Sequence, residues 1–169
     1  MKLLRDLLFR IKNKLLDILI RTKYKFFYTL KNHILYPLQM TPFCKGSIKK
    51  LHIGKNVSLV NTLFNTSSGH IYIGNNTIFG HNVMVLTGRH EFINGIRKSL
   101  VTGGLETPLH GNDIKIGDGC WIASGAIIIG KVEIGDNVIV AAGSVVTKSF
   151  PSKVMIGGVP AKIIKKLEN

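Results

Sequence analysis

Residues 116–147 read, in blocks of six, Ile116-Gly-Asp-Gly-Cys-Trp, Ile122-Ala-Ser-Gly-Ala-Ile, Ile128-Ile-Gly-Lys-Val-Glu, Ile134-Gly-Asp-Asn-Val-Ile, Val140-Ala-Ala-Gly-Ser-Val and Val146-Thr. Every block opens with an aliphatic residue, and in each complete block a small or aliphatic residue follows four places later. This period fits neither the roughly 3.6 residues per turn of an α-helix nor the alternation of a plain strand. It is typical of a parallel β-helix, whose short strands end in turns and stack in identical register. We expect three sides per coil, each with one inward aliphatic residue.

The same period begins earlier in the chain, with one shift of phase. Repeats start at Leu51, but Ile73 lies fourteen residues after Leu59 rather than twelve. We expect a bulged corner in the polar stretch 65–69 to hold the two extra residues.

A longer interruption follows between Val85 and Ile116, where the six-residue pattern is absent. We expect residues 88–113 to leave the coils as an excursion loop. Loops of this length in compact domains tend to carry function, because packing alone does not require them.

The N-terminal residues 1–33 have a different composition. Apolar residues recur at steps of three and four, which predicts an amphipathic helix. The segment holds nine Lys and Arg against two Asp, half of the net charge of +14. A basic amphipathic helix with the aromatic cluster at residues 26–28 is typical of a membrane-surface element. The alternative is that its apolar stripe packs on the β-helix or on a partner subunit.

The repeat pattern and the composition together predict three regions of the chain. Residues 1–50 form a basic helix and linker, residues 51–160 form the β-helix, and residues 161–169 form a short C-terminal helix that covers the open end of the coils. Cys120 occupies an inward position of the repeat. Cys44 and Cys120 are too far apart in the sequence to form a metal-binding motif. A reducing compartment is therefore the simpler assumption.

Three features bear on location and partners. The sequence shows no secretory signal and no run of about 20 apolar residues that would span a bilayer. We therefore expect a cytoplasmic protein, attached peripherally to the inner face of the cell membrane if the helix binds lipid. The excess of positive charge indicates an acidic partner. Nucleic acid is not expected, because the charge lies in an amphipathic helix rather than in a nucleic-acid module.

The repeats resemble the hexapeptide-repeat acyltransferase superfamily, whose members form left-handed parallel β-helices. The segments Ile116-Gly-Asp-Gly-Cys-Trp-Ile, Ala141-Ala-Gly-Ser-Val-Val-Thr-Lys and Gly157-Gly-Val-Pro-Ala-Lys are similar to the signature of the maltose/galactoside and polysaccharide O-acetyltransferase group. The resemblance implies an all-β core, acetyl-CoA as acyl donor, no metal, and homotrimers with active sites between subunits. A basic N-terminal helix departs from that group, whose N-terminal segment is compact.

The resemblance also implies roles for residues in the excursion loop. Thr87-Gly-Arg-His90 looks like the segment that carries the family's general base. A histidine is suited to removing a proton from a sugar hydroxyl near neutral pH. Arg97 matches a position that could bind acceptor oxygens, and Glu106 lies where the group often has an acidic residue. Trp121, at an outward position, is expected to line the acceptor pocket or a subunit seam.

Other residues are expected to bind the donor. Thr147 and Lys148 match the family's coenzyme A-contacting Thr-Lys pair, with Lys148 near phosphate. Ser124, Ala142 and Gly143 are small, which leaves corner backbone groups accessible to the pantetheine amides. Lys162 is a further candidate for phosphate contact.

The function predicted is therefore an acetyl-CoA-dependent O-acetyltransferase acting on a sugar hydroxyl of a surface-polysaccharide or lipid-linked glycan precursor, with His90 as general base. An amino-sugar N-acetyltransferase and a xenobiotic acetyltransferase are alternatives on the same fold. A γ-type carbonic anhydrase would need three histidines on one zinc ion, for which His81 and His90 are candidates without a third. A non-catalytic trimeric scaffold is the remaining class.

Overall fold

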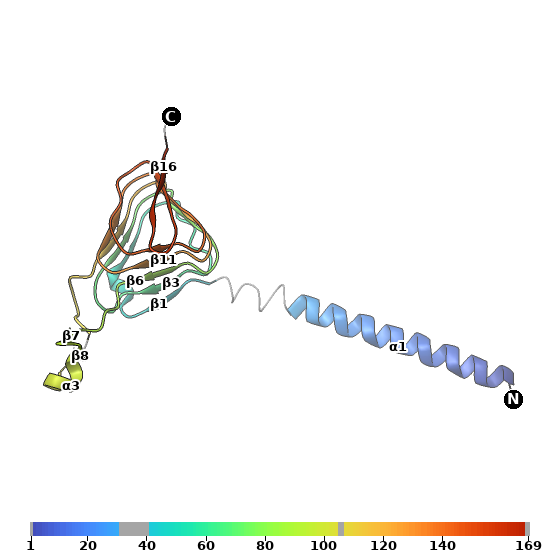
Figure 1. The fold of residues 1–169 in the computed structure, drawn as a ribbon. Helices are drawn as coiled ribbons and strands as arrows, with labels where there is room; N and C mark the ends of the chain where they lie inside the picture. Colours follow the sequence, from blue (N-terminus) through green and yellow to red (C-terminus); the bar gives the residue numbers. More distant parts are fainter. Residues whose placement is uncertain (1, 31–40, 105–106, 168–169) are drawn as a thin grey trace. The chain divides into compact units, whose positions relative to one another are not determined.

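The computed structural model describes residues 2–30, 41–104 and 107–167. The chain forms two compact units, Met1–Met40 and Thr41–Asn169. The second unit contains the β-helix, and a view along its axis shows coils with a triangular outline (Figure 1).

The first unit contains the helix α1 (Lys2–Leu30), so the helix expected within residues 1–33 is confirmed as far as the described residues reach. Apolar side chains in its second half lie open to solvent, with Leu15 61% and Leu19 68% exposed. On the polar side, Arg21 Nε lies 2.9 Å from Asp17 Oδ2. Within the described part of the chain, no helix combines the length and apolarity that a bilayer crossing needs.

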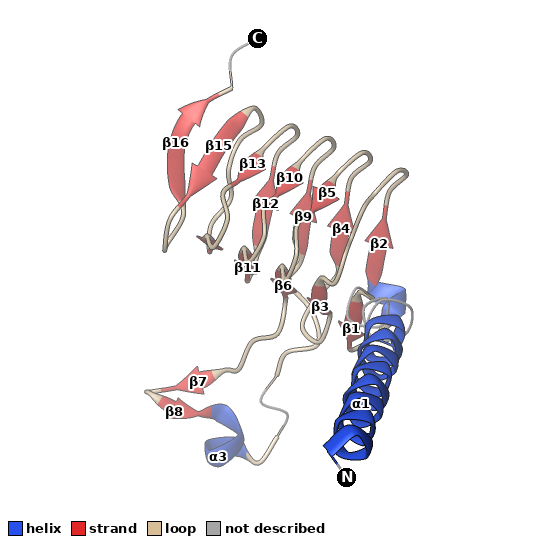
Figure 2. Ribbon diagram, turned by 90° about the vertical axis from the view of Figure 1, so that its right-hand side faces the viewer, coloured by secondary structure: helices blue, strands red, loops and turns tan. Residues whose placement is uncertain are grey.

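The β-helix in the second unit has three sheets, here called faces A, B and C, which form the sides of the triangle and are parallel except for the last strand of face C. Face A contains β1 (Phe43–Lys45), β3 (Leu63–Asn65), β6 (Met84–Leu86), β11 (Ile127–Ile129) and β14 (Val145–Val146). Face B contains β2 (Leu51–Ile53), β4 (Ile71–Ile73), β9 (Ile114–Ile116) and β12 (Val132–Ile134). Face C contains β5 (Ile78–Phe79), β10 (Trp121–Ile122), β13 (Ile139–Val140), β15 (Val154–Gly157) and β16 (Lys162–Lys166). Figure 2 shows the coils side by side, from β2 on the right to β15 and β16 on the left.

The core is a column of aliphatic side chains inside the triangle. On face A, Val85, Ile128 and Val146 are register partners, and all three are fully buried. Regular coils repeat after 18 residues, as between Ile114 and Val132 on face B. Because each inward side chain stacks on its equivalent one coil away, each contributes about 1.5–3 kcal/mol by leaving water. Cys120 is 1% exposed, which confirms its inward position.

The two ends of the β-helix differ from the expectation. The coils begin at β1, which pairs in parallel with β3, rather than at Leu51. A six-residue period could not reveal β1, because the corner after it contains a 3-10 helix, η2 (Ile48–Lys50). The expected C-terminal helix is wrong, since β16 is a strand that pairs antiparallel with β15. The β-branched pair Ile163–Ile164 favours a strand, and pairing satisfies the edge that β15 would otherwise expose.

Extra residues accumulate at one edge of the triangle, where the chain passes from face A to face B. We call this the A–B edge. Between β11 and β12 the corner has two residues, whereas the corners after β1 and β3 each have five. The bulge predicted at residues 65–69 is thereby confirmed. At the same edge, 27 residues separate β6 from β9, and within them β7 and β8 form a sheet apart from the three faces.

The excursion loop has structure of its own. A hairpin joins β7 (Phe92–Ile93) to β8 (Ile96–Arg97). Its turn residues, Asn94 and Gly95, both have positive φ, as a two-residue type I′ turn requires. The helix α3 (Lys98–Thr102) follows. Lys98 Nζ lies 2.7 Å from Glu91 Oε2 and closes the hairpin at its base. This hydrogen bond from Lys98 lowers the pKa of Glu91, so the pair persists at neutral pH and weakens as the carboxylate is protonated in acid.

Buried polar side chains hold both ends of the loop. Thr87, fully buried, donates from Oγ1 to the Asn65 carbonyl at 2.8 Å and accepts a hydrogen bond from Ser68 N at 3.2 Å. Asn112, where the chain returns, donates from Nδ2 to the Thr87 carbonyl. Arg89 N donates to Ser68 Oγ at 3.2 Å. Because these groups are satisfied only together, they fix where residues 88–90 leave the coil.

Replacing Thr87 by Val tests this network. The variant Thr87→Val leaves Asn65 O and Ser68 N without their side-chain partner, so we expect the free energy of unfolding to fall by about 1–3 kcal/mol. The matched control is Thr102→Val in α3, where the exposed hydroxyl donates to Lys98 O at 3.1 Å and the expected change is within about 0.5 kcal/mol. Urea unfolding at one protein concentration measures both. Equal stability of the two variants would show that the network does not hold the loop.

Candidate active site

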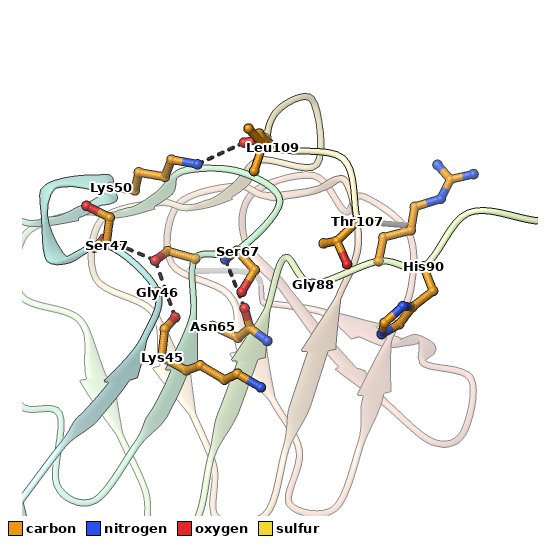
Figure 3. A pocket seen from close by; sticks show the side chains of 12 residues that line it. Lys45, Gly46, Ser47, Lys50, Asn65, Ser67, Gly88, His90, Thr107 and Leu109 are labelled. Atoms are coloured by element: carbon orange, nitrogen blue, oxygen red, sulfur yellow. Dashed lines mark hydrogen bonds between the residues drawn. The ribbon is translucent and has the colours of Figure 1, made fainter. Parts of the chain in front are cut away.

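A pocket of about 600 Å³ opens at the A–B edge and includes His90. Figure 3 shows Lys45, Asn65 and Ser67 on one side of it and Thr107 and His90 on the other. The pocket is lined by Lys45, Gly46, Ser47, Lys50, Asn65, Thr66, Ser67, Gly88, Arg89, His90, Thr107 and Leu109. His90, at the start of the excursion loop, therefore lies at a pocket, and its catalytic role stays a prediction.

Three separate segments build this pocket, namely the enlarged corner after β1, the enlarged corner after β3, and the excursion loop. Hydrogen bonds tie the three together. Thr66 Oγ1 donates to the Ser47 carbonyl at 3.0 Å, which joins the first two corners. Lys50 Nζ donates to the Leu109 carbonyl at 2.8 Å, which joins the first corner to the returning end of the loop. The pocket thus exists because insertions stack at the same edge in successive coils.

His90 lies three residues beyond buried Thr87 and is exposed. The hydrogen bond from Arg89 N to Ser68 Oγ positions the residue before it. A Cβ added at Gly88 would lie 2.8 Å from Asn65 Nδ2, so a side chain here would displace the amide of Asn65. An imidazole held in this way at a polar pocket can accept a proton from a hydroxyl bound in front of it.

The other residues predicted to bind the acceptor are not brought to this pocket. Arg97 is exposed at the junction of β8 and α3. Trp121 is 49% exposed on the outer surface of face C, which confirms its outward position. Neither residue lines the His90 pocket. Glu106 lies outside the described residues.

The residues predicted to bind the donor are distributed over two edges and the last strand. Ser124, Ala142 and Gly143 lie where the chain passes from face C to face A, the C–A edge. There, Gly143 N donates to the Ser124 carbonyl at 3.0 Å. Thr147 and Lys148 follow β14 at the A–B edge, and Lys148 Nζ lies 5.6 Å from the centre of the Phe150 ring.

Lys162 is the first residue of β16, on face C. None of the predicted donor residues lines the pocket that contains His90. Within a single chain the structure therefore separates the predicted donor residues from the predicted base.

Nine of the twelve lining residues were not identified from the sequence. Five of the nine are polar side chains in or next to the two enlarged corners, namely Lys45, Ser47, Lys50, Asn65 and Ser67. The phase shift near residue 65 was a signal for one corner. Nothing in the repeat pattern signalled the other, because η2 and β1 precede the first complete repeat.

The side chains that line the pocket are polar and positively charged. Lys45, Lys50 and Arg89 contribute cations, and no Asp or Glu is among the described residues that line it. Among the described residues, no group of three or more His, Cys, Asp or Glu side chains is placed to hold a metal ion.

Comparison with known proteins agrees with this architecture. Residues 113–148 match the bacterial transferase hexapeptide family, described by six repeats. The galactoside O-acetyltransferase of Escherichia coli K12 is 32% identical over 127 residues, which cover 75% of this chain and 58% of the relative. The chain spans about half the length of the curated relatives that it matches.

Two solved structures show the same fold. A maltose O-acetyltransferase from Clostridium difficile 630 superposes with a TM-score of 0.61 at 32% identity, covering 76% of this chain and 65% of that one. A galactoside acetyltransferase in complex with coenzyme A gives a TM-score of 0.54 at 29% identity, covering 74% and 59%. The predicted left-handed parallel β-helix is confirmed. In its repeats and its fold, the chain is similar to the hexapeptide-repeat acyltransferases.

Proposed function

We propose that the protein is an acetyl-CoA-dependent O-acetyltransferase that acts on a sugar hydroxyl of a surface-polysaccharide or lipid-linked glycan precursor. The observation that carries this proposal is the placement of His90 in a polar pocket built by three stacked insertions at the A–B edge. Similarity to a galactoside O-acetyltransferase and to a coenzyme A complex supports the reaction class and the donor.

The reaction follows from the chemistry of these groups. The His90 imidazole takes the proton of the acceptor hydroxyl, and the hydroxyl oxygen attacks the carbonyl carbon of the thioester. The tetrahedral intermediate collapses with cleavage of the carbon–sulfur bond. The imidazolium then returns its proton to the departing thiolate. The enzyme needs no covalent intermediate, because the thioester is already activated.

The active unit in this proposal is a homotrimer with sites between subunits. The outward surfaces of the three faces differ in a way that supports this. On face C, Ile78, Trp121, Ile139 and Met155 form a register-aligned apolar row. Face A carries a second such row, formed by Phe43, Leu63, Met84, Ile127 and Val145.

Face B, by contrast, presents His52, Tyr72, Lys115 and Glu133 along its outward row. Two apolar faces and one polar face suit a β-helix that meets a neighbour on each of two sides. Docking face A of one subunit against face C of the next brings a C–A edge toward an A–B edge. The donor residues Ser124, Ala142, Gly143, Thr147, Lys148 and Lys162 would then line the groove between subunits.

We further propose that α1 attaches the enzyme peripherally to the cytoplasmic face of the cell membrane. Its exposed apolar side chains include Ile11, Leu15, Ile18 and Leu19. The lysines and arginines among them are attracted to anionic lipid headgroups. A membrane-bound enzyme would meet a lipid-linked glycan precursor at the surface where that precursor resides.

The catalytic proposal is tested by His90→Ala. We expect kcat/KM for acetyl transfer to fall about 10²–10⁴-fold, because the acceptor loses its general base. Release of coenzyme A is measured with panels of neutral, acidic and amino sugars. His52→Ala, on the outward row of face B, is the matched control and keeps wild-type activity. Full activity of His90→Ala would remove His90 from the mechanism.

The trimer is tested by placing a charge on an apolar face. Ile78, on face C, is 47% exposed, and Tyr72, on the polar face B, is 38% exposed. We expect Ile78→Lys to yield monomers and Tyr72→Lys to leave trimers, because only the former buries an unpaired charge in the interface. Light scattering coupled to size-exclusion chromatography measures the mass. Trimers of Ile78→Lys, or a monomeric wild type, would contradict the proposed interface.

Membrane attachment is tested by flotation of the full chain with vesicles. Binding is expected to vesicles that contain phosphatidylglycerol and to be at least about tenfold weaker to phosphatidylcholine alone, since the basic residues add electrostatic attraction. The double variant Leu15→Asp and Leu19→Asp should bind at least about tenfold more weakly, because it removes apolar burial and adds repulsion. If the wild type floats with neither kind of vesicle, the proposed attachment is refuted.

A further inference from the structure

We infer that the pocket at His90 binds an anionic acceptor, meaning a sugar that carries a phosphate or a carboxylate close to the hydroxyl that is acetylated. This inference rests on the proposed acetyl transfer and adds to it the chemical class of the acceptor. Its basis is the charge of the pocket, which none of the predicted substrate residues suggested.

Positive charge reaches the pocket from two segments that are distant in sequence, the corner after β1 and the start of the excursion loop. Lys45 ends β1, Lys50 ends η2, and Arg89 opens the excursion loop. They meet only because the enlarged corners stack at one edge. Such convergence differs from a solvated run of lysines, whose members adjoin one another along the chain.

The positive charge is not balanced by acidic side chains in the described part of the pocket lining. The nearest acidic residue in sequence to His90 is Glu91, and it pairs with Lys98 at 2.7 Å. Lys50 is held in place through its hydrogen bond to the Leu109 carbonyl. A pocket with three cations and no described carboxylate attracts an oxyanion, and it offers Arg89 as a planar donor for it.

The remaining lining groups suit the sugar itself. Ser47, Asn65, Ser67 and Thr107 bring hydroxyl and amide groups to the same pocket. These groups can donate to and accept from sugar hydroxyls. The volume, about 600 Å³, lies within the range of small-molecule sites and admits a monosaccharide together with a phosphate group.

Binding is tested without relying on turnover. The imidazole resonances of histidine-labelled full-length protein are recorded by NMR during titration with inorganic diphosphate, with saturating coenzyme A present to occupy the donor site. His90→Gln identifies the His90 signal among the six histidines. We expect a saturable shift of the His90 signal, and galactose at equal concentration should produce a much smaller one.

Variants then assign the effect to the pocket. Lys45→Gln and Arg89→Gln are each expected to weaken the diphosphate titration about tenfold, the effect of losing one hydrogen bond to a charged group. Lys55→Gln, an exposed lysine outside the pocket lining, is the charge-matched control and should leave the titration unchanged. The inference would be overturned if diphosphate left the His90 signal unchanged, or if Lys55→Gln weakened diphosphate binding as much as the pocket variants do. It would also be overturned if diphosphate shifted the His90 signal only when coenzyme A was left out.

Kinetic comparison distinguishes the source of the oxyanion and separates the two proposals. Coenzyme A release is measured with N-acetylglucosamine, N-acetylglucosamine 1-phosphate and glucuronic acid. A preference for the sugar with the phosphate or for the one with the carboxylate supports the inference and identifies the anion. In Arg89→Gln we expect this preference to fall about tenfold, through a higher KM for the charged sugar. Equal or better use of the neutral sugar overturns the inference while leaving acetyl transfer intact. If His90→Ala keeps full activity with both the charged and the neutral sugars, the proposed function is overturned instead.

Discussion

Ile128 lies in register between Val85 and Val146. Stacking of buried side chains from one coil to the next recurs along every face of the β-helix. Because each inward residue must meet its equivalent one coil away, a strand cannot slip without moving its apolar side chains out of the core. Extra residues are therefore excluded from the strands and can be accommodated only at corners. The stacking of the core thus decides where insertions, and with them the pocket, can occur.

The A–B edge collects those insertions in three successive coils. Two corners of five residues and one segment of 27 residues stack there, and buried Thr87 links two of them through Asn65 and Ser68. A rigid support of this kind suits a site that must hold an imidazole against a bound hydroxyl. The loop beyond it departs from the repeat, and its hairpin depends on local turn chemistry at Asn94 and Gly95.

Much of the fold could be predicted from the sequence. Strands that stack in the same register place their inward residues at a fixed interval along the chain, and that interval is visible in the sequence. The coils from Ile71 onward, the bulge and the excursion loop all follow from where the six-residue period holds or breaks. β1 and β16 could not be predicted, since one precedes the first repeat and the other pairs antiparallel outside the period. For the pocket, His90 was predictable from its motif. Lys45 and Lys50 were not, because only the stacking of corners brings them beside it.

We propose that the excursion loop places His90 beside an acetyl donor bound between subunits. A crystal structure of the full-length protein with coenzyme A tests this most directly. We expect a trimer in which the thiol of coenzyme A lies in a groove between two subunits, within hydrogen-bonding reach of a His90 imidazole. Coenzyme A bound to an isolated chain, or with its thiol remote from every His90, would contradict it.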